Sequence, residues 1–300
     1  MKIKGSIYDR GSSKHHEDGM IVSPPFFGVL DGVSAPYSPA HPPKIFKGGI
    51  SGGEMVSRVV ERQFAKISPL RSLQEAVRLA NRDVARKQLR QKIPFDGGEL
   101  AGASFAVTKI NGDWVEIIQG CDVFALWMMK DGSIGMTETQ NTASETYLNQ
   151  KIVDLMREIA TERGVVLKKT DDETRNEIRN EMWDRFYPIL VETRREYVNN
   201  PWLRDSYGLL NGQPELDMKW FNINLPRSEV KTLLLFTDGM VPWWGSLEGL
   251  PTEEVARMVY ETYEQGGLTG LLARARGIEE TTKATSYTDA AEATAIAIEF

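Results

Sequence analysis

Residues 102–137 read GASFAVTKINGDWVEIIQGCDVFALWMMKDGSIGMT. Four short runs, rich in β-branched and aromatic residues, are separated by polar turn residues that include Asn111-Gly112 and Asp131-Gly132. Asn-Gly and Asp-Gly between apolar runs are strong hairpin signals, because tight hairpin turns need positive φ angles. This stretch therefore predicts an antiparallel meander of four strands.

The segments around this meander have strand and helix patterns in separate groups. Residues 2–30 look strand-like at both ends, whereas four prolines make residues 33–47 irregular. Apolar residues at helical spacing predict one helix after Gly53 and another after Pro69. Towards the C-terminus the pattern predicts strands at 220–224 and 232–237, helices at 252–264 and 268–276, and a last strand at 293–300. Grouped strands and grouped helices indicate an α+β fold.

Residues 145–205 differ from both neighbours in being strongly charged and helical in pattern. Ile152, Leu155 and Ile159 would share one helix face, and Thr170 to Glu173 has the form of a capping box that starts a second helix. We interpret this segment as a helical insertion that packs beside the core. The chain as a whole, residues 1–300, is interpreted as one domain that carries this insertion.

Composition excludes several classes of function. The 300 residues are 41% hydrophobic and 26% charged, which is typical of a globular protein. A single cysteine, Cys121, excludes an internal disulfide and a zinc site built from several cysteines, and the three histidines lie near the N-terminus. The net charge of −6 does not favour a nucleic-acid or anionic-membrane partner. No secretory signal or membrane-length apolar segment is visible, so we expect a cytoplasmic location.

Two of the Asp-Gly pairs follow buried strands instead of joining hairpins. FFGVL runs into Asp31-Gly32, and LLLFT runs into Asp238-Gly239. Two such aspartates converge if their strands are neighbours in a sheet, and convergent carboxylates need a proton or a cation between them. Mg²⁺ or Mn²⁺ suits oxygen ligands of this kind. Further acids that could complete the site are Glu17-Asp18 near the N-terminus, and Asp289 or Glu292 before the last strand.

These residues, taken in order, resemble a known family. His16-Glu17-Asp18, FGVLDG at 27–32, GAS at 102–104, Cys121-Asp122, TDG at 237–239, and a terminal acid before ATAI follow one another along nearly the whole chain. The set resembles the PP2C-type (PPM) metal-dependent serine/threonine phosphatases. It is most similar to their divergent bacterial branch, where a stretch such as YGLLNGQP at 207–214 also occurs.

The resemblance implies a four-layer α-β-β-α sandwich with two mainly antiparallel sheets and a centre of two Mn²⁺ or Mg²⁺ ions. Asp31 would bridge both metals and Gly32 would offer its carbonyl, while Asp238 and the C-terminal acid, Asp289 or Glu292, would bind one of them. Glu17 or Asp18 would hold the other metal, and Asp122 would help to hold a third, weaker one. Asp31 and Asp238 would thus be the catalytic residues in hydrolysis of phosphoserine or phosphothreonine in proteins by a metal-bridging water. The 145–205 insertion would be the substrate-side flap.

Three positions depart from the family pattern. Ser13 stands where a phosphate-binding arginine is usual, with Lys14 and His15 beside it as substitute phosphate contacts, although His15 could also be a solvated loop residue. Val33 stands where a general-acid histidine is usual, and Ala291 lies between the two candidate terminal acids. The sequence therefore leaves open a phosphatase acting on phosphoproteins, a pseudophosphatase that binds without turnover, and a phosphatase for small phosphometabolites. It does not indicate the oligomeric state.

Overall fold

In the computed structural model the described residues are 1–95, 98–167, 170–241, 251–283 and 290–300. Within these ranges the strands form two five-stranded sheets, in the orders β1-β10-β9-β6-β7 and β2-β3-β4-β5-β8, and every pair is antiparallel. The strands are β1 Lys2–Asp9, β2 Gly19–Ser23, β3 Phe26–Val33, β4 Gly102–Asn111, β5 Trp114–Gly120, β6 Phe124–Met129, β7 Ile134–Met136, β8 Phe221–Pro226, β9 Val230–Phe236 and β10 Ala293–Glu299.

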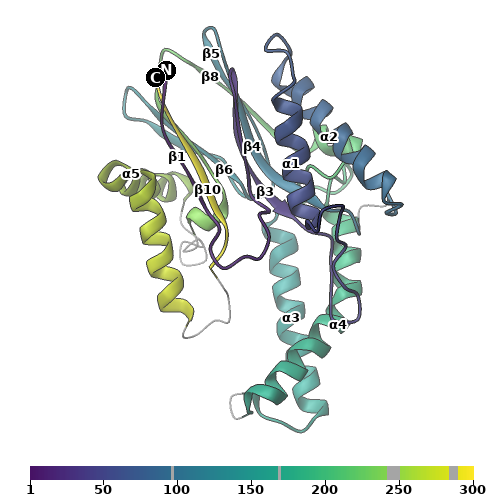
Figure 1. Ribbon diagram of the computed structural model, residues 1–300. Helices are drawn as coiled ribbons and strands as arrows, with labels where there is room; N and C mark the ends of the chain where they lie inside the picture. Colours follow the sequence, from purple (N-terminus) through teal and green to yellow (C-terminus); the bar gives the residue numbers. More distant parts are fainter. Residues whose placement is uncertain (96–97, 168–169, 242–250, 284–289) are drawn as a thin grey trace.

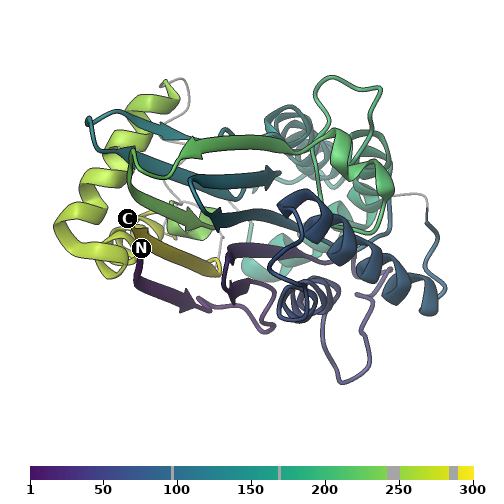
Figure 2. The ribbon, with the colours of Figure 1, turned by 90° about the horizontal axis from the view of Figure 1, so that it is seen from above.

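Helices cover the outer faces of both sheets. Helices α1 (Gly52–Phe64) and α2 (Leu73–Arg90) pack on the β2-β3-β4-β5-β8 sheet, whereas α5 (Thr252–Lys283) packs on the other (Figures 1 and 2). Three apolar layers therefore hold the sandwich together, one between the sheets and one under each helical layer. The α+β class, the α-β-β-α layering and the antiparallel sheets are all confirmed.

Strand β3 shows how the sequence builds two of these layers at once. Phe27 and Val29 point between the sheets, whereas Phe26 and Leu30 point into the layer under α1 and α2. Successive side chains alternate between the faces of a strand, so a strand covered on both sides is apolar at every position. By the same alternation Asp31 continues the row that faces the opposite sheet, at the end of the strand.

The meander prediction for residues 102–137 is only half right. Strands β4 and β5 form a hairpin, and so do β6 and β7, but β5 and β6 belong to opposite sheets. The chain crosses between the sheets at Cys121-Asp122, where Cys121 has φ of +67°. The pattern of apolar residues does not reveal this crossing because β5 and β6 are mostly buried and lack the clean alternation that marks one solvent-facing side.

The predicted insertion is a pair of long helices that extends away from the sandwich (Figure 1). Helix α3 spans Thr142–Glu162 and α4 spans Asp172–Tyr197, so the helical part is shorter than 145–205 at its C-terminal end and begins slightly earlier. The pair has an apolar cluster of its own, formed by Ile159 of α3 with Ile178, Met182 and Phe186 of α4. Ile152 and Leu155 pack against the same cluster, so the shared face expected for the first helix is confirmed.

The C-terminal elements follow the expected order. The predicted strands at 220–224, 232–237 and 293–300 correspond to β8, β9 and β10, and the two predicted helices form α5 on either side of a kink at Gly267, which has φ of +63°. Two short 3-10 helices lie at Pro214–Met218 and Asp238–Met240. Among the described residues, none of the helices has both the length and the apolar character needed to cross a bilayer.

Candidate functional site

The acids singled out by sequence meet at one edge of the sandwich. Asp31 lies at the end of β3, Asp238 follows β9, Asp18 precedes β2, Asp122 precedes β6 and Glu292 precedes β10. In antiparallel sheets the end of one strand lies beside the beginning of its neighbour, so these five positions share an edge. Asp31 and Asp238 come close although β3 and β9 belong to facing sheets, so their convergence does not require neighbouring strands of one sheet.

A pocket of about 760 Å³ opens at this edge. Its walls come from the loop before β2, the end of β3, the start of α1 and the segments after β9 and before β10. The candidate residues that line it are Lys14, His15, Glu17, Asp18, Asp31, Gly32, Asp238 and Glu292. Sequence reasoning thus placed the phosphate-contact candidates and most metal-ligand candidates in one cavity, whereas Asp122 lies outside its lining.

The carboxylates raise one another's pKa. Burial raises the pKa of Asp31 well above its usual range, and the charges of Asp18 and Asp238 raise it further. Burial, aided by the charge of Glu292, raises the pKa of Asp18 to about 7. The pKa of Asp238 rises to about 8, first because protein surrounds the residue and then because the charges of Asp122 and Asp18 lie nearby. The side chain of Asp238 nevertheless opens onto the pocket. Such a cluster holds excess negative charge that a cation would neutralise.

Two glycines let backbone segments approach each other closely at the site. A Cβ atom on Gly32 would lie 2.3 Å from the carbonyl oxygen of Glu17, and one on Gly239 would lie 1.8 Å from the carbonyl oxygen of Glu292. Both distances are shorter than any real contact, so neither position accepts a side chain without a backbone shift. The glycine after each aspartate therefore serves close packing around the two carboxylates.

Segments from the N-terminal and C-terminal parts of the chain meet at Asp18. The Asp18 amide donates to Glu292 Oε2 at 2.7 Å, and the Thr237 hydroxyl donates to Asp18 Oδ2 at 3.0 Å. Thr237 in turn accepts a hydrogen bond from the Thr294 amide at 2.9 Å. Glu292 is therefore the terminal acid that the structure places beside the cluster. Asp289, the other candidate, lies outside the described residues.

Helix α4 reaches the site through a basic side chain that sequence reasoning missed. Arg194 Nη1 donates to the Ser34 carbonyl at 2.9 Å, and the Ser34 hydroxyl donates to Glu17 Oε1 at 2.5 Å. Burial lowers the pKa of Arg194, which lies near the charge of Glu17. No local pattern marks Arg194, because its partner is 160 positions away in the sequence.

Helix α3 reaches the opposite side of the cluster through Asn141. Its amide donates to Asp122 Oδ2 at 2.7 Å and to Glu145 Oε1 at 2.9 Å, and so bridges two carboxylates. Burial and the charge of Asp122 raise the pKa of Glu145 to about 7. The only sequence signal for this bridge is the i, i+4 spacing of Asn141 and Glu145 at the start of the helix.

We expect Asn141→Ala to reduce whatever metal-dependent activity the site has by about 10- to 100-fold, because the bridge orients Asp122 from behind. Steady-state kinetics over a range of Mn²⁺ concentrations would measure this loss as a higher metal requirement. Asn222→Ala, on the exposed side of β8, is the matched control and should behave like the wild type. Equal activity in both variants would show that the bridge does not support the site.

The remaining candidates are arranged as follows. His15 Nδ1 lies 3.9 Å from Glu54 Oε2 on α1, and Lys14 lines the pocket beside it. Val33 packs in a small apolar cluster with Cys121 and offers no proton donor. Burial raises the pKa of the Cys121 thiol well above its usual range, which agrees with a small buried hydrophobe and not with a nucleophile.

The donor set fits a hard divalent cation in charge and chemistry. Asp122 Oδ1 and Glu292 Oε1 are buried oxygen atoms without a hydrogen-bond partner in the described structure, and buried carboxylate oxygens are normally satisfied. Carboxylates and carbonyls are also the ligands that Mg²⁺ and Mn²⁺ prefer. No three acidic, histidine or cysteine side chains among the described residues already have metal-ligand spacing. The fit therefore rests on charge, burial and unpaired oxygens.

Comparison with solved structures identifies the fold. The chain is similar to the catalytic domain of the serine/threonine phosphatase PstP in complex with two manganese ions, with 14% identity, a TM-score of 0.51, and coverage of 98% of this chain and 96% of that one. It is similar to the phosphatase Stp1 from Staphylococcus aureus, with 14% identity, a TM-score of 0.52, and coverage of 100% and 96%. It is also similar to the PPM phosphatase MsPP from Mycobacterium smegmatis, with 14% identity, a TM-score of 0.50, and full coverage of both chains.

Sequence comparison adds nothing to this result: no family model matches the chain, and neither does any curated protein. The chain thus has the fold of the PP2C-type serine/threonine phosphatases, as the order of its motifs predicted. The layers, both sheets and the long helical pair all fall within the matched length.

Proposed function

We propose that this protein is a metal-dependent phosphatase that hydrolyses phosphoserine or phosphothreonine in proteins. The observation that carries the proposal is the convergence of Asp18, Asp31, Asp122 and Asp238 at one edge of a PP2C-type fold. None of these four carboxylates forms an ion pair with a basic side chain in the described part of the chain. Uncompensated carboxylates at a pocket wall are a costly arrangement that metal binding explains.

The residues that would hold the metals are those at the pocket edge. Asp31 and the Gly32 carbonyl, with Asp18 and Asp238 on either side, would bind two Mn²⁺ or Mg²⁺ ions, and Glu292 or Asp289 would complete the set. Asp122, supported by Asn141, would hold a third and weaker ion. When bound, such ions lower the pKa of water and neutralise charge on phosphoryl oxygens.

The pocket supplies the other requirements through its own side chains. Lys14 and His15 line the same pocket as the carboxylates and would attract the dianionic phosphoryl group. Arg194 holds the Ser34 carbonyl, and Ser34 fixes the Glu17 carboxylate, so α4 positions one side of the pocket. With Val33 in an apolar cluster, protonation of the leaving group would fall to water or to another residue.

The direct test is hydrolysis of an aryl phosphate and of phosphoserine and phosphothreonine peptides after chelation and addition of Mn²⁺ or Mg²⁺. We expect no turnover after chelation, recovery with Mn²⁺, and preference for phosphopeptides over small phosphometabolites in a substrate panel. Preference for a phosphometabolite would replace the protein-phosphatase assignment by a metabolic one. Turnover that persists after chelation would contradict the metal mechanism.

A second candidate is a pseudophosphatase that binds phosphoproteins without turnover. Val33 favours it, because this residue packs against Cys121 and leaves the pocket without the usual histidine. Metal analysis of the purified protein separates the two candidates. About two equivalents of bound Mn²⁺ with turnover supports the enzyme, whereas phosphopeptide binding without metal or turnover supports the binding protein.

A further inference from the structure

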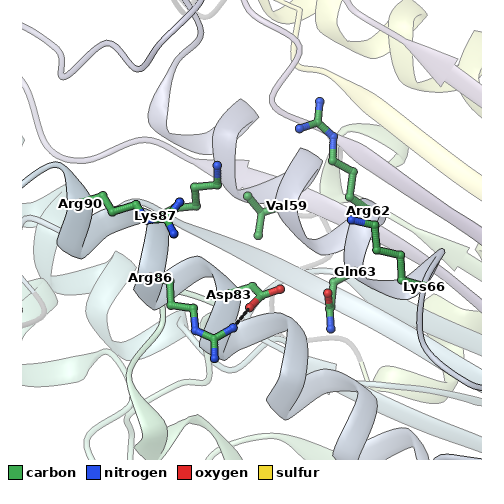
Figure 3. A pocket seen from close by; sticks show the side chains of 8 residues that line it. All are labelled: Val59, Arg62, Gln63, Lys66, Asp83, Arg86, Lys87 and Arg90. Atoms are coloured by element: carbon green, nitrogen blue, oxygen red, sulfur yellow. Dashed lines mark hydrogen bonds and ion pairs between the residues drawn. The ribbon is translucent and has the colours of Figure 1, made fainter.

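The outer surface of the α1–α2 pair carries a groove with a basic rim. Arg62 of α1 and Lys66 of the turn after it lie on one side, and Arg86, Lys87 and Arg90 of α2 lie on the other (Figure 3). The hollow between them measures about 290 Å³. All five side chains belong to exposed residues, so their charges face solvent.

Most of these cations are not neutralised by the protein itself. Arg86 pairs with Asp83 at 2.7 Å (Figure 3). In contrast Arg62, Lys66, Lys87 and Arg90 form no ion pair with any described residue. This concentration of positive charge stands out on a chain with a net charge of −6. A surface of one sign attracts and orients partners of the opposite sign.

The groove continues into a second hollow of about 340 Å³ that has an apolar floor. The two hollows adjoin, since both are lined by Val59, Arg62, Lys87 and Arg90. The floor of the second hollow is formed by Phe46, Ile50, Met55 and Val59. Lys47 extends the basic rim, whereas Arg58 is paired with Glu54 on the same helix. The whole surface, which we call the α1–α2 groove, thus combines a rim of mostly unneutralised basic side chains with a place for an apolar side chain.

We propose that the α1–α2 groove binds an acidic peptide segment of a partner protein, with carboxylates on the rim and one apolar side chain on the floor. Single-stranded nucleic acid fits less well, because stacking of its bases needs an exposed aromatic ring and Phe46 is only 7% exposed. An anionic membrane fits less well because the apolar residues line a concave floor and not a protruding face. The proposal does not depend on the metal site, since no rim or floor residue lines the 760 Å³ pocket.

The test measures binding of a fluorescein-labelled peptide of glutamates around a central leucine to the full chain by fluorescence anisotropy. We expect saturable binding at low salt that weakens as salt is added, and weaker binding when serine replaces the leucine. Arg62→Glu combined with Lys87→Glu should weaken binding by at least about tenfold, because both residues face the two hollows.

The matched control is Lys151→Glu combined with Arg157→Glu. It changes the net charge by the same amount as the Arg62/Lys87 variant, but both of its residues lie on α3, outside the α1–α2 pair. This control should bind the peptide like the wild type, and both double variants should melt cooperatively. Equal loss in both variants, or no binding by the wild type, would overturn the proposal. Tighter binding of single-stranded RNA or anionic vesicles, lost in the Arg62/Lys87 variant, would reassign the groove to that polyanion.

Discussion

Asp31→Asn and Asp238→Asn should each lower Mn²⁺-stimulated hydrolysis of an aryl phosphate on the order of 10³-fold. Asn keeps the size of the side chain but removes the charge that would hold the cations. The effect should be larger for Asp31, whose carboxylate lies within the fields of Asp18, Asp238 and Asp122 together. Initial rates at saturating Mn²⁺ measure the loss, and the folded state is checked by circular dichroism.

Asp131→Asn is the matched control for these variants. Asp131 is also followed by a glycine, but it lies in an exposed hairpin turn, where it accepts hydrogen bonds from Ser133. This variant should retain full activity. Activity that persists in both Asp31→Asn and Asp238→Asn would contradict the proposed mechanism, whatever the control shows.

In the metal-free protein, the contribution of Asp18 to stability should decrease as the pH rises from about 4 to about 7. The pKa of Asp18 is about 7 in the folded protein and 3.8 in an ordinary carboxyl, so in this window the folded state retains a proton that the unfolded state has released. The contribution of Asp18 to the free energy of unfolding then decreases as the pH rises. The free energy of unfolding of metal-free Asp18→Asn should therefore exceed that of the wild type by up to about 4 kcal/mol at pH ~8. At pH ~4 the two proteins should be equally stable.

Urea unfolding at both pH values, with chelator present, measures this difference. Adding Mn²⁺ should reverse the order if Asp18 is a metal ligand, because a cation held by the folded wild type would stabilise it more than the variant. Asp131→Asn should show no comparable gain at high pH, since hydrogen bonds lower the pKa of Asp131 instead of raising it. A wild type that is more stable than Asp18→Asn at high pH without metal would show that the cluster is not strained by its own charge.

The layers of the fold could be predicted because local patterns reflect them directly. Turn glycines such as Gly112 and Gly132 mark both hairpins, and the apolar spacing of the helices marks their buried faces. The assignment of each strand to a sheet could not be predicted in the same way. Strands β5 and β6 are separated by only a few residues at Cys121-Asp122, yet they belong to opposite sheets, and their burial leaves no alternation to show it.

In the site, too, residues marked by a local sequence pattern could be predicted, whereas residues placed by tertiary packing could not. Asp31 and Asp238 could be found because each stands at the end of an apolar strand, and Asp18 and Glu292 stand just before strands that begin at the same edge. The residues that hold these acids in place were not found. Arg194 and Asn141 act on partners brought near by tertiary packing, and an arginine or asparagine in a charged helical segment has many ordinary explanations.

The α3–α4 pair contacts the surroundings of the acid cluster at two points. At the first point, Asn141 donates a hydrogen bond to the Asp122 carboxylate, and at the second, Arg194 donates one to the Ser34 carbonyl. The body of the pair depends on its own apolar cluster around Met182 and on its own ion pairs between arginines and glutamates. The contacts between the pair and the acid cluster thus lie at its base, whereas contacts within the pair stabilise its far end.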